Sequence, residues 1–308
     1  MLHPQRVLPA LKGNGLRQLR KLSGLKARPK APVLGQSIDS VISRHAGLCR
    51  HLGELLPADF SLVEMEACEA GPGDCLATAA LVLGLGARHV DLVELEPPVV
   101  NLKQNDVLKA LHDQGFPVAL DLIQELPQVA LNTDKVGYHT TFMDNFVADR
   151  KYALVYSLCV GEHVENLETF FASCYRATKP GGINLHMIDL GGHGQFEDPV
   201  PPLDFQTYPD WLYGMMFPPF HRATRRFLGD YLRVIEKAGF IVEKLHRLRE
   251  ADAAYLQSIR PKLRNAARAV PLTELALIEF AVTLRRPWGI KELVRDTGFE
   301  PVTPTVSR

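Results

Sequence analysis

The chain has 308 residues, 46% of them hydrophobic, with 35 basic and 35 acidic side chains. This length and apolar content favour one large α/β domain with extensions over several small domains. A net charge of zero excludes a whole-molecule field that would attract nucleic acid or an anionic membrane. Every apolar run is shorter than the roughly 20 residues that cross a bilayer, so we expect no transmembrane segment.

The cysteines are five in number and contain no C-x-x-C pair: Cys49, Cys68, Cys75, Cys159 and Cys174. An odd count at wide spacings argues against a disulfide framework and against a thiolate zinc site. We therefore expect no metal, and a reducing cytoplasm as the location.

Residues 1–36 form a basic arm whose first 31 residues carry eight Lys or Arg and no acid. Four leucines recur in it at helix-like spacing: Leu16, Leu19, Leu22 and Leu25. Such a segment is typical of a contact with a membrane surface or nucleic acid, of an import presequence, or of a solvated arm. We favour the solvated arm because no cleavage pattern follows it.

Periodicity predicts the remaining elements in chain order. Apolar residues at three- and four-residue steps predict a helix over 37–56. Short apolar strands then alternate with helical stretches, which is typical of a parallel sheet with crossover helices. We expect strands over 63–70, 89–94, 136–140, 152–157, 183–189, 240–245 and 277–284, the last two suiting an antiparallel edge, and a helix over 227–238 that stops at Gly239.

Two segments stand apart from this alternation. Residues 191–226 form an insertion rich in Pro and aromatic side chains, which predicts either a substrate wall or a loop packed on its own small core. Residues 287–308 show no apolar periodicity, so we expect a disordered tail outside the core. The end of this tail is similar to tails of unrelated predicted reading frames, which points to an error in the gene model. The main domain is then 37–286.

The first expected strand runs into the segment Glu69-Ala70-Gly71-Pro72-Gly73-Asp74, and an Ala-rich helical stretch follows it. Residues without a Cβ let the backbone approach a ligand, and the helix start offers unpaired N–H groups. The second strand ends in Glu94, an acid that can accept hydrogen bonds from ribose hydroxyls. This pattern predicts a site for an adenosine cofactor.

Two details argue against a dinucleotide in this site. The third glycine that a pyrophosphate site requires is replaced by Leu76. The carboxylate of Glu69 directly before the turn would repel a pyrophosphate but attract a sulfonium or ammonium group.

At this point the sequence resembles the class I methyltransferases that use S-adenosylmethionine (SAM), over roughly residues 59–286. Three further motifs carry the resemblance in order: Glu94 as the ribose acid, Tyr152-Ala153-Leu154-Val155-Tyr156-Ser157 followed by Glu162-His163-Val164, and Arg176-Ala177-Thr178-Lys179-Pro180-Gly181-Gly182. The chain departs from the family at Ala153, where Asp is common, and at Thr141, where an acid is common.

The resemblance implies a Rossmann-like, doubly wound sheet of seven strands, mostly parallel with an antiparallel last strand, and helices on both faces. It also implies SAM as the cofactor and assigns the residues around it. The methionine part would lie among Glu69, Gly71 and Gly73; the ribose at Glu94; the adenine at Leu95 and Thr141; and the far side at Ser157.

Methyl transfer often needs a base at the carboxyl ends of the strands. We expect Asp189 and His193, which leave the fifth strand together, to be the catalytic pair, although His193 is equally typical of a loop residue. His163 is expected to cap or pack beneath the helix after the fourth strand, and His186 to be a buried core residue. Because His186 and Asp189 point to opposite faces of a strand, H-x-x-D does not predict a metal site.

The acceptor class follows by elimination. Ser157-Leu158-Cys159-Val160 is not the Asn/Asp-Pro-Pro-aromatic motif of nucleic-acid amine methyltransferases, and Cys159 lacks the context of a nucleophilic thiolate. We therefore expect a small-molecule or glycan-precursor acceptor, with Arg222, Arg225 and Arg226 either holding an anionic group or simply solvated. The alternatives are a SAM-fold binding protein without catalysis and an RNA methyltransferase served by the basic arm.

Overall fold

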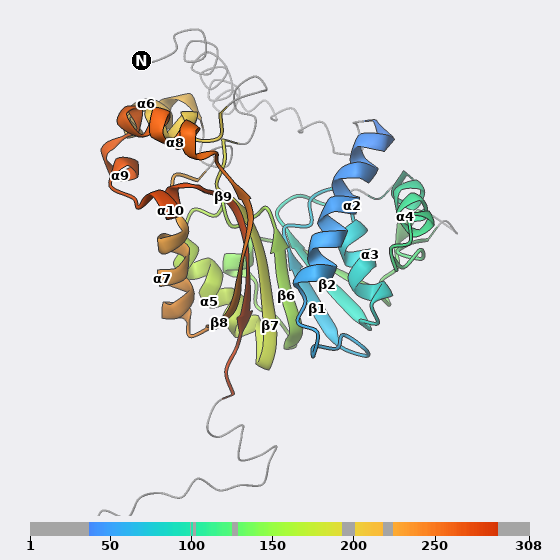
Figure 1. Ribbon diagram of the computed structural model, residues 1–308. Coiled ribbons are helices and arrows are strands. Elements are labelled where there is room, and N and C mark those ends of the chain that lie inside the picture. Colours follow the sequence, from blue (N-terminus) through green and yellow to red (C-terminus); the bar gives the residue numbers. More distant parts are fainter. Residues whose placement is uncertain are drawn as a thin grey trace, which may run out of the picture.

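The computed structural model describes residues 37–98, 100, 103–124, 129–192, 201–217 and 224–288, which hold a seven-stranded sheet between two layers of helices (Figure 1). The basic arm over 1–36 and all but the first two residues of the tail lie outside these ranges, so the expectations for them stay predictions.

The sheet has the strand order β5-β2-β1-β6-β7-β9-β8. The strands are β1 (Glu66–Ala70), β2 (His89–Glu94), β5 (Val136–Thr140), β6 (Tyr152–Leu158), β7 (Thr178–Asp189), β8 (Ile241–Glu250) and β9 (Leu277–Arg285). The five strands from β5 to β7 pair in parallel, and β9 runs antiparallel between β7 and β8. This confirms the predicted sheet. The order reverses between β1 and β6, and ligands of such sheets bind at the carboxyl ends of the strands beside this point.

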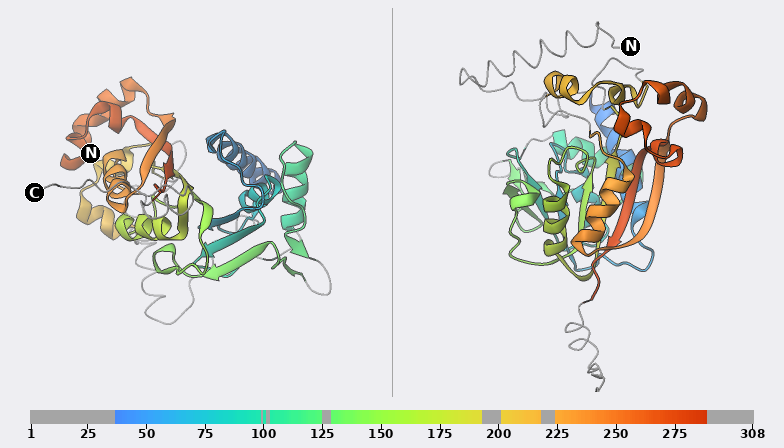
Figure 2. Two further views of the ribbon diagram at one scale, coloured as in Figure 1. Left: turned by 90° about the horizontal axis from the view of Figure 1, so that it is seen from below. Right: turned by 90° about the vertical axis from the view of Figure 1, so that its left-hand side faces the viewer.

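Each face of the sheet has its own apolar core. One core joins the sheet to α2 (Ile38–Leu55), α3 (Ala77–Gly84) and α4 (Lys103–Asp113), and the other joins it to α5 (Leu167–Ala177) and α7 (Leu228–Ala238). Figure 2 shows the two helix layers from below. A short ladder of β3 (Ile123–Gln124) and β4 (Ala130–Leu131) and a turn of 3₁₀ helix, η2 (Met143–Asn145), complete the connections of the α/β core.

The local chemistry explains most of the element ends. The helix predicted over 37–56 is α2, and the hydroxyl of its N-cap Ser37 accepts the N–H of Ser40. Helix α7 ends at Gly239 as expected, because this residue takes a φ of 97° that favours glycine. Strand β1 begins later than predicted, at Glu66, because Glu64 has a φ of 60° and breaks the extended run.

A group of short helices lies at the upper left of Figure 1, above α7 and the β8–β9 pair. It contains η3 (Asp204–Thr207), α6 (Asp210–Met216), α8 (Ala253–Ile259), η5 (Arg260–Lys262), α9 (Asn265–Arg268) and α10 (Leu272–Leu275). Sequence periodicity did not reveal the helices between β8 and β9. We call the whole group the helical cap.

The described part of the aromatic insertion packs on itself within this cap. Phe205, Tyr208, Tyr213 and Phe217 are buried in one small cluster, and the Arg225 guanidinium lies 4.6 Å from the centre of the Tyr213 ring. The insertion was predicted to be either a substrate wall or a loop packed on its own small core, and these residues pack in the second way.

Within the described ranges, the helices are all too short or too polar to cross a membrane.

Candidate functional site

The glycine turn after β1 has the conformation that the sequence predicts. Gly71 and Gly73 have φ angles of 72° and 68°, a region that side chains disfavour. A Cβ on Gly71 would lie 2.5 Å from the Val160 side chain, so this glycine allows the turn to pack against the loop after β6. A Cβ on Gly73 would meet nothing within 4 Å. The backbone of Gly73 therefore borders open space, as a ligand-binding turn requires.

Glu94 ends β2 beside this turn. One carboxylate oxygen accepts the Gly73 N–H at 3.1 Å, and the other accepts the Leu95 N–H at 2.7 Å. The carboxylate thus joins the end of β2 to the turn after β1, two neighbouring strands of the sheet. A partly exposed carboxylate next to open space can accept hydrogen bonds from a pair of hydroxyls, which is the role expected for it.

Glu69 lies behind the turn and not on its open side. Its side chain is buried and accepts hydrogen bonds from the Thr78 hydroxyl at 2.6 Å and the Tyr156 hydroxyl at 2.9 Å. Burial raises the pKa of this carboxyl to about 7, although the two hydrogen bonds partly oppose the rise and Glu94 adds to it. In the structure Glu69 clamps β1 to α3 and β6, so it can act on a ligand only through its charge or through the turn.

The residues expected at the adenine lie together at the ends of β2 and β5. The Thr141 N–H donates to the Glu94 carbonyl at 3.0 Å, and Leu95 is 43% exposed. The neighbouring Phe142 is also exposed, at 41%. Exposed apolar side chains beside Glu94 can pack on a flat ring, and adenine binding at this corner stays a prediction. Ala153, the departure from the family, is buried in β6.

Ser157 lies apart from this group. Its side chain is fully buried on the α5 face of the sheet, 2.8 Å from Nδ1 of His186. Phe170 and Phe171 of α5 make edge contacts with the His186 ring, and burial lowers the pKa of this histidine to about 3. His186 is therefore a neutral core residue, as expected. The Ser157 side chain points into the core and not toward the turn.

Asp189 is the last residue of β7, at the carboxyl edge of the sheet. Its Oδ1 accepts the Gly191 N–H at 2.7 Å and pairs with Arg249 at 3.1 Å, and Arg249 also pairs with Glu279 at 3.3 Å. The second expected member of the catalytic pair, His193, lies outside the described residues, so the pairing of His193 with Asp189 stays a prediction.

The expectation for His163 is wrong. This histidine is exposed in the turn before α5, and the cap of that helix is Asn166, whose side chain accepts the Thr169 N–H at 3.2 Å. The amide of Asn166 thus accepts one of the unpaired N–H groups at this helix start. The neighbouring Glu162 is buried instead, and burial raises its pKa well above the ordinary value.

The described arginines of the insertion are engaged within the protein. Arg225 donates to the carbonyls of Phe205 and Tyr208, and Arg226 donates to those of Val164 and Glu165. They hold the helical cap and the loop after β6 together, so neither expected alternative, anion binding or simple solvation, describes them. Arg222 lies outside the described residues.

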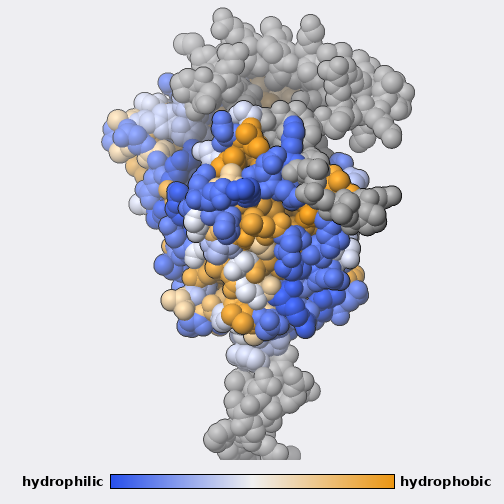
Figure 3. Space-filling view, turned by 90° about the vertical axis from the view of Figure 1, so that its right-hand side faces the viewer, coloured by the Kyte–Doolittle hydropathy of each residue, from blue (hydrophilic) through white to orange (hydrophobic). Residues whose placement is uncertain are grey.

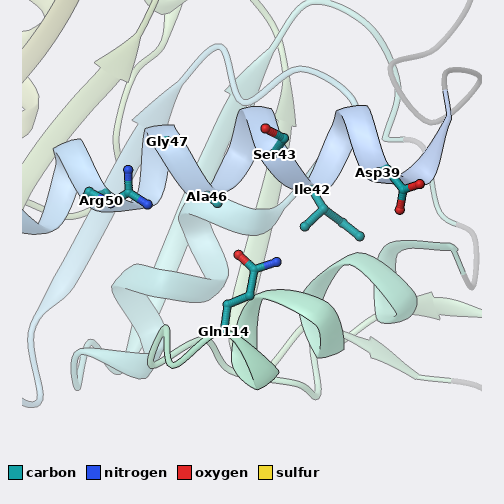
Figure 4. A pocket seen from close by; sticks show the side chains of 7 residues that line it. All are labelled: Asp39, Ile42, Ser43, Ala46, Gly47, Arg50 and Gln114. Atoms are coloured by element: carbon teal, nitrogen blue, oxygen red, sulfur yellow. The ribbon is translucent and has the colours of Figure 1, made fainter.

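A hollow of about 480 Å³ lies between α2 and the end of α4 (Figure 4). Its lining includes Asp39, Ser43 and Arg50 of α2, toward which Gln114 points. Figure 3 faces the side that carries α4 in Figure 1 and shows apolar surface bordered by polar side chains. The residues predicted for the cofactor are not among those that line the hollow.

Sequence reasoning assigned no role to several residues that shape the site. Thr78 and Tyr156 hold Glu69, Arg249 holds Asp189, and Glu162 is buried near the end of β6. Strand alternation was the available signal for Glu69, because it places this side chain on the same face as Ala67, toward α3. The other contacts join segments far apart in sequence and have no local pattern.

Comparison with known proteins agrees with this geometry. A family model described as a methyltransferase domain matches residues 68–185, from β1 into β7. A ubiquinone biosynthesis O-methyltransferase of Rickettsia bellii is 31% identical over 105 residues, which are 32% of this chain and 44% of the relative. The chain thus matches less than half the length of the curated relative.

The similar solved structures are more distant in sequence. A SAM-dependent methyltransferase from Mesorhizobium loti is 14% identical, with a TM-score of 0.46, and the match covers 80% of this chain and all of that one. A geranyl diphosphate C-methyltransferase from Streptomyces coelicolor is 13% identical, with a TM-score of 0.48, over 84% and 86% of the two chains. The match to a methyltransferase domain over residues 68–185, the sheet order and the glycine turn with its paired acid agree with the resemblance to the class I SAM-dependent methyltransferases.

Proposed function

We propose that this protein transfers the methyl group of SAM to an oxygen atom of a small-molecule or glycan-precursor acceptor. The observation that carries the proposal is the Glu94 carboxylate at the Gly73 N–H, beside backbone that borders open space. The name of the Rickettsia bellii relative, an O-methyltransferase of ubiquinone biosynthesis, supports oxygen on a small molecule.

In this proposal one set of residues binds the cofactor and another set acts on the acceptor. Glu94 accepts the ribose hydroxyls, Gly71 and Gly73 let the backbone approach the methionine part, and Leu95 and Thr141 flank the adenine. When ionised, Glu69 contributes negative charge from behind the turn, in a buried environment of low dielectric. Bound SAM supplies an electrophilic methyl carbon on a sulfonium.

The acceptor side lies at the end of β7. The acceptor oxygen attacks the methyl carbon in line with the breaking S–CH₃ bond, the bond electrons stay on sulfur, and the acceptor proton leaves to a base. We assign that base to the pair of Asp189 and His193, with Asp189 orienting the imidazole.

The free thiols among the described residues support a reducing, cytoplasmic location as part of the same proposal.

The test is formation of the demethylated cofactor in the presence of acceptor panels: phenols and other hydroxyl compounds, sugar precursors, amines and RNA. We expect turnover with a hydroxyl panel, and a loss of at least about a hundredfold in kcat for Asp189→Asn with an unchanged affinity for SAM. Turnover only with RNA would contradict the small-molecule or glycan-precursor acceptor and favour an RNA methyltransferase. SAM binding without turnover on any panel would favour the non-catalytic alternative.

A further inference from the structure

The glycine turn is also held by hydrogen bonds from a residue outside the two strands beside it. Gln104, in the first turn of α4, is buried with 1% of its surface exposed. Its Oε1 accepts the Leu76 N–H at 3.2 Å, and its Nε2 donates to the Asp74 carbonyl at 2.9 Å. A single amide therefore spans the last residues of the turn from a helix 28 positions further along the chain.

This contact satisfies the backbone N–H of the residue that begins helix α3. Helix α3 starts directly after the turn, its N-cap is Leu76, and the apolar side chain of that residue makes no cap hydrogen bond. A buried N–H of an N-cap residue needs an acceptor, which a Glu or Gln at the third helical position supplies in a capping box. Here Gln104 supplies it from another helix.

Three anchors thus fix the turn at successive points. Gly71 donates its N–H to the Val93 carbonyl at 2.8 Å, Gly73 donates to Glu94, and Leu76 donates to Gln104. The acceptors at Val93 and Glu94 belong to β2, and Gln104 belongs to the helix that follows β2. A bound ribose would compete with the Gly73 N–H for the Glu94 carboxylate, but it would not compete for the other two acceptors. The Gln104 anchor would then keep the turn in place while Glu94 changes partners.

We propose that Gln104 is a positioning residue for the cofactor, which holds the glycine turn in its binding conformation through Asp74 and Leu76. This inference rests on the proposed function and adds to it a residue outside the family motifs. Removing the amide leaves the turn free to sample other conformations, so SAM must restore the order on binding. The affinity for SAM falls as a result, while the acceptor side at β7 is untouched.

The main variant is Gln104→Met, which keeps length and removes both hydrogen bonds. We expect its Kd and KM for SAM to rise about tenfold, in line with the loss of a buried hydrogen-bonded pair, and its KM for the acceptor to stay unchanged. The matched control is Gln114→Met, the same change in the exposed turn directly after the same helix. An affinity of Gln104→Met within twofold of the wild type would overturn the inference.

Amide hydrogen exchange of Leu76 without any ligand separates this inference from the proposed function. We expect Leu76 to exchange much faster in Gln104→Met than in the wild type, and to stay slow in Gln104→Glu, which keeps an acceptor but loses the donor to Asp74. Unchanged exchange in Gln104→Met would refute the anchor even if SAM binds. A wild type that fails to bind SAM but shows the expected exchange would refute the proposed function and leave the anchor standing.

Discussion

Glu69 makes the stability of this protein depend on pH in a way that one substitution removes. The folded protein raises the pKa of this carboxyl to about 7, against an ordinary value of 4.5, mainly through burial. Between these two values the folded state keeps a proton that the unfolded state has lost. The free energy of unfolding therefore falls as the pH rises, because the folded state binds more protons than the unfolded state.

The size of the effect follows from the two pKa values. Between pH 5 and pH 8 this one group lowers the free energy of unfolding by about 2.5 kcal/mol. In Glu69→Gln the side chain no longer titrates, while its carbonyl can still accept from Thr78 and its amide can donate to the Tyr156 hydroxyl. We therefore expect the variant to gain stability relative to the wild type by about that amount over the same range.

Urea unfolding of both proteins at pH 5, 6, 7 and 8 measures this difference. All other titrating groups are common to the two chains, so the difference between the two curves isolates Glu69. A difference that grows steadily up to about pH 7 and then levels off is the expected result. A constant difference across the range would refute the assignment of a raised pKa to Glu69.

Four further variants test the packing and the site. Burial lowers the pKa of His186 to about 3, so the unfolded state binds a proton first as the pH falls. In urea unfolding, the free energy of unfolding of the wild type should therefore fall by about 2 kcal/mol between pH 7 and pH 5 relative to that of the Ser157→Ala/His186→Leu double variant. Gly71→Ala places a Cβ against Val160 and should lower the Tm by several degrees, whereas a smaller loss than in Gly73→Ala would contradict the close packing. Gly73→Ala has room in the protein and should instead weaken SAM binding; equal affinity by calorimetry would show that the open space is not the cofactor's. Arg249→Met removes a half-exposed ion pair from Asp189 and should cost under about 1 kcal/mol, so a larger loss on urea unfolding would mean that the cluster is structural.

Sequence patterns were sufficient for the sheet because its strands follow one simple rule. Buried parallel strands read as short apolar runs, and each run after the glycine turn falls on an observed strand. The four-residue helices α9 and α10 escaped because so short a segment carries no measurable periodicity. They are held by packing within the helical cap, which no local pattern encodes.

The site was predictable to the extent that backbone conformation determines it. Gly71, Gly73 and Glu94 follow from a turn that needs positive φ angles and from an acid at the next strand end. The direction of the Glu69 side chain required strand alternation, and the Gln104 anchor required the tertiary packing of α4. Hydrogen bonds that join residues about 30 positions apart leave no trace in a local motif.

The most direct test of the central claim is a calorimetric titration of SAM into the wild type, Glu94→Ala and Glu96→Ala. Glu96 is an exposed neighbour of Glu94 and controls for the loss of one negative charge. We expect micromolar binding to the wild type and to Glu96→Ala, and a loss of at least about tenfold in Glu94→Ala. Equal affinities in all three proteins, or no binding to the wild type, would contradict the claim that the glycine turn and Glu94 form the cofactor site.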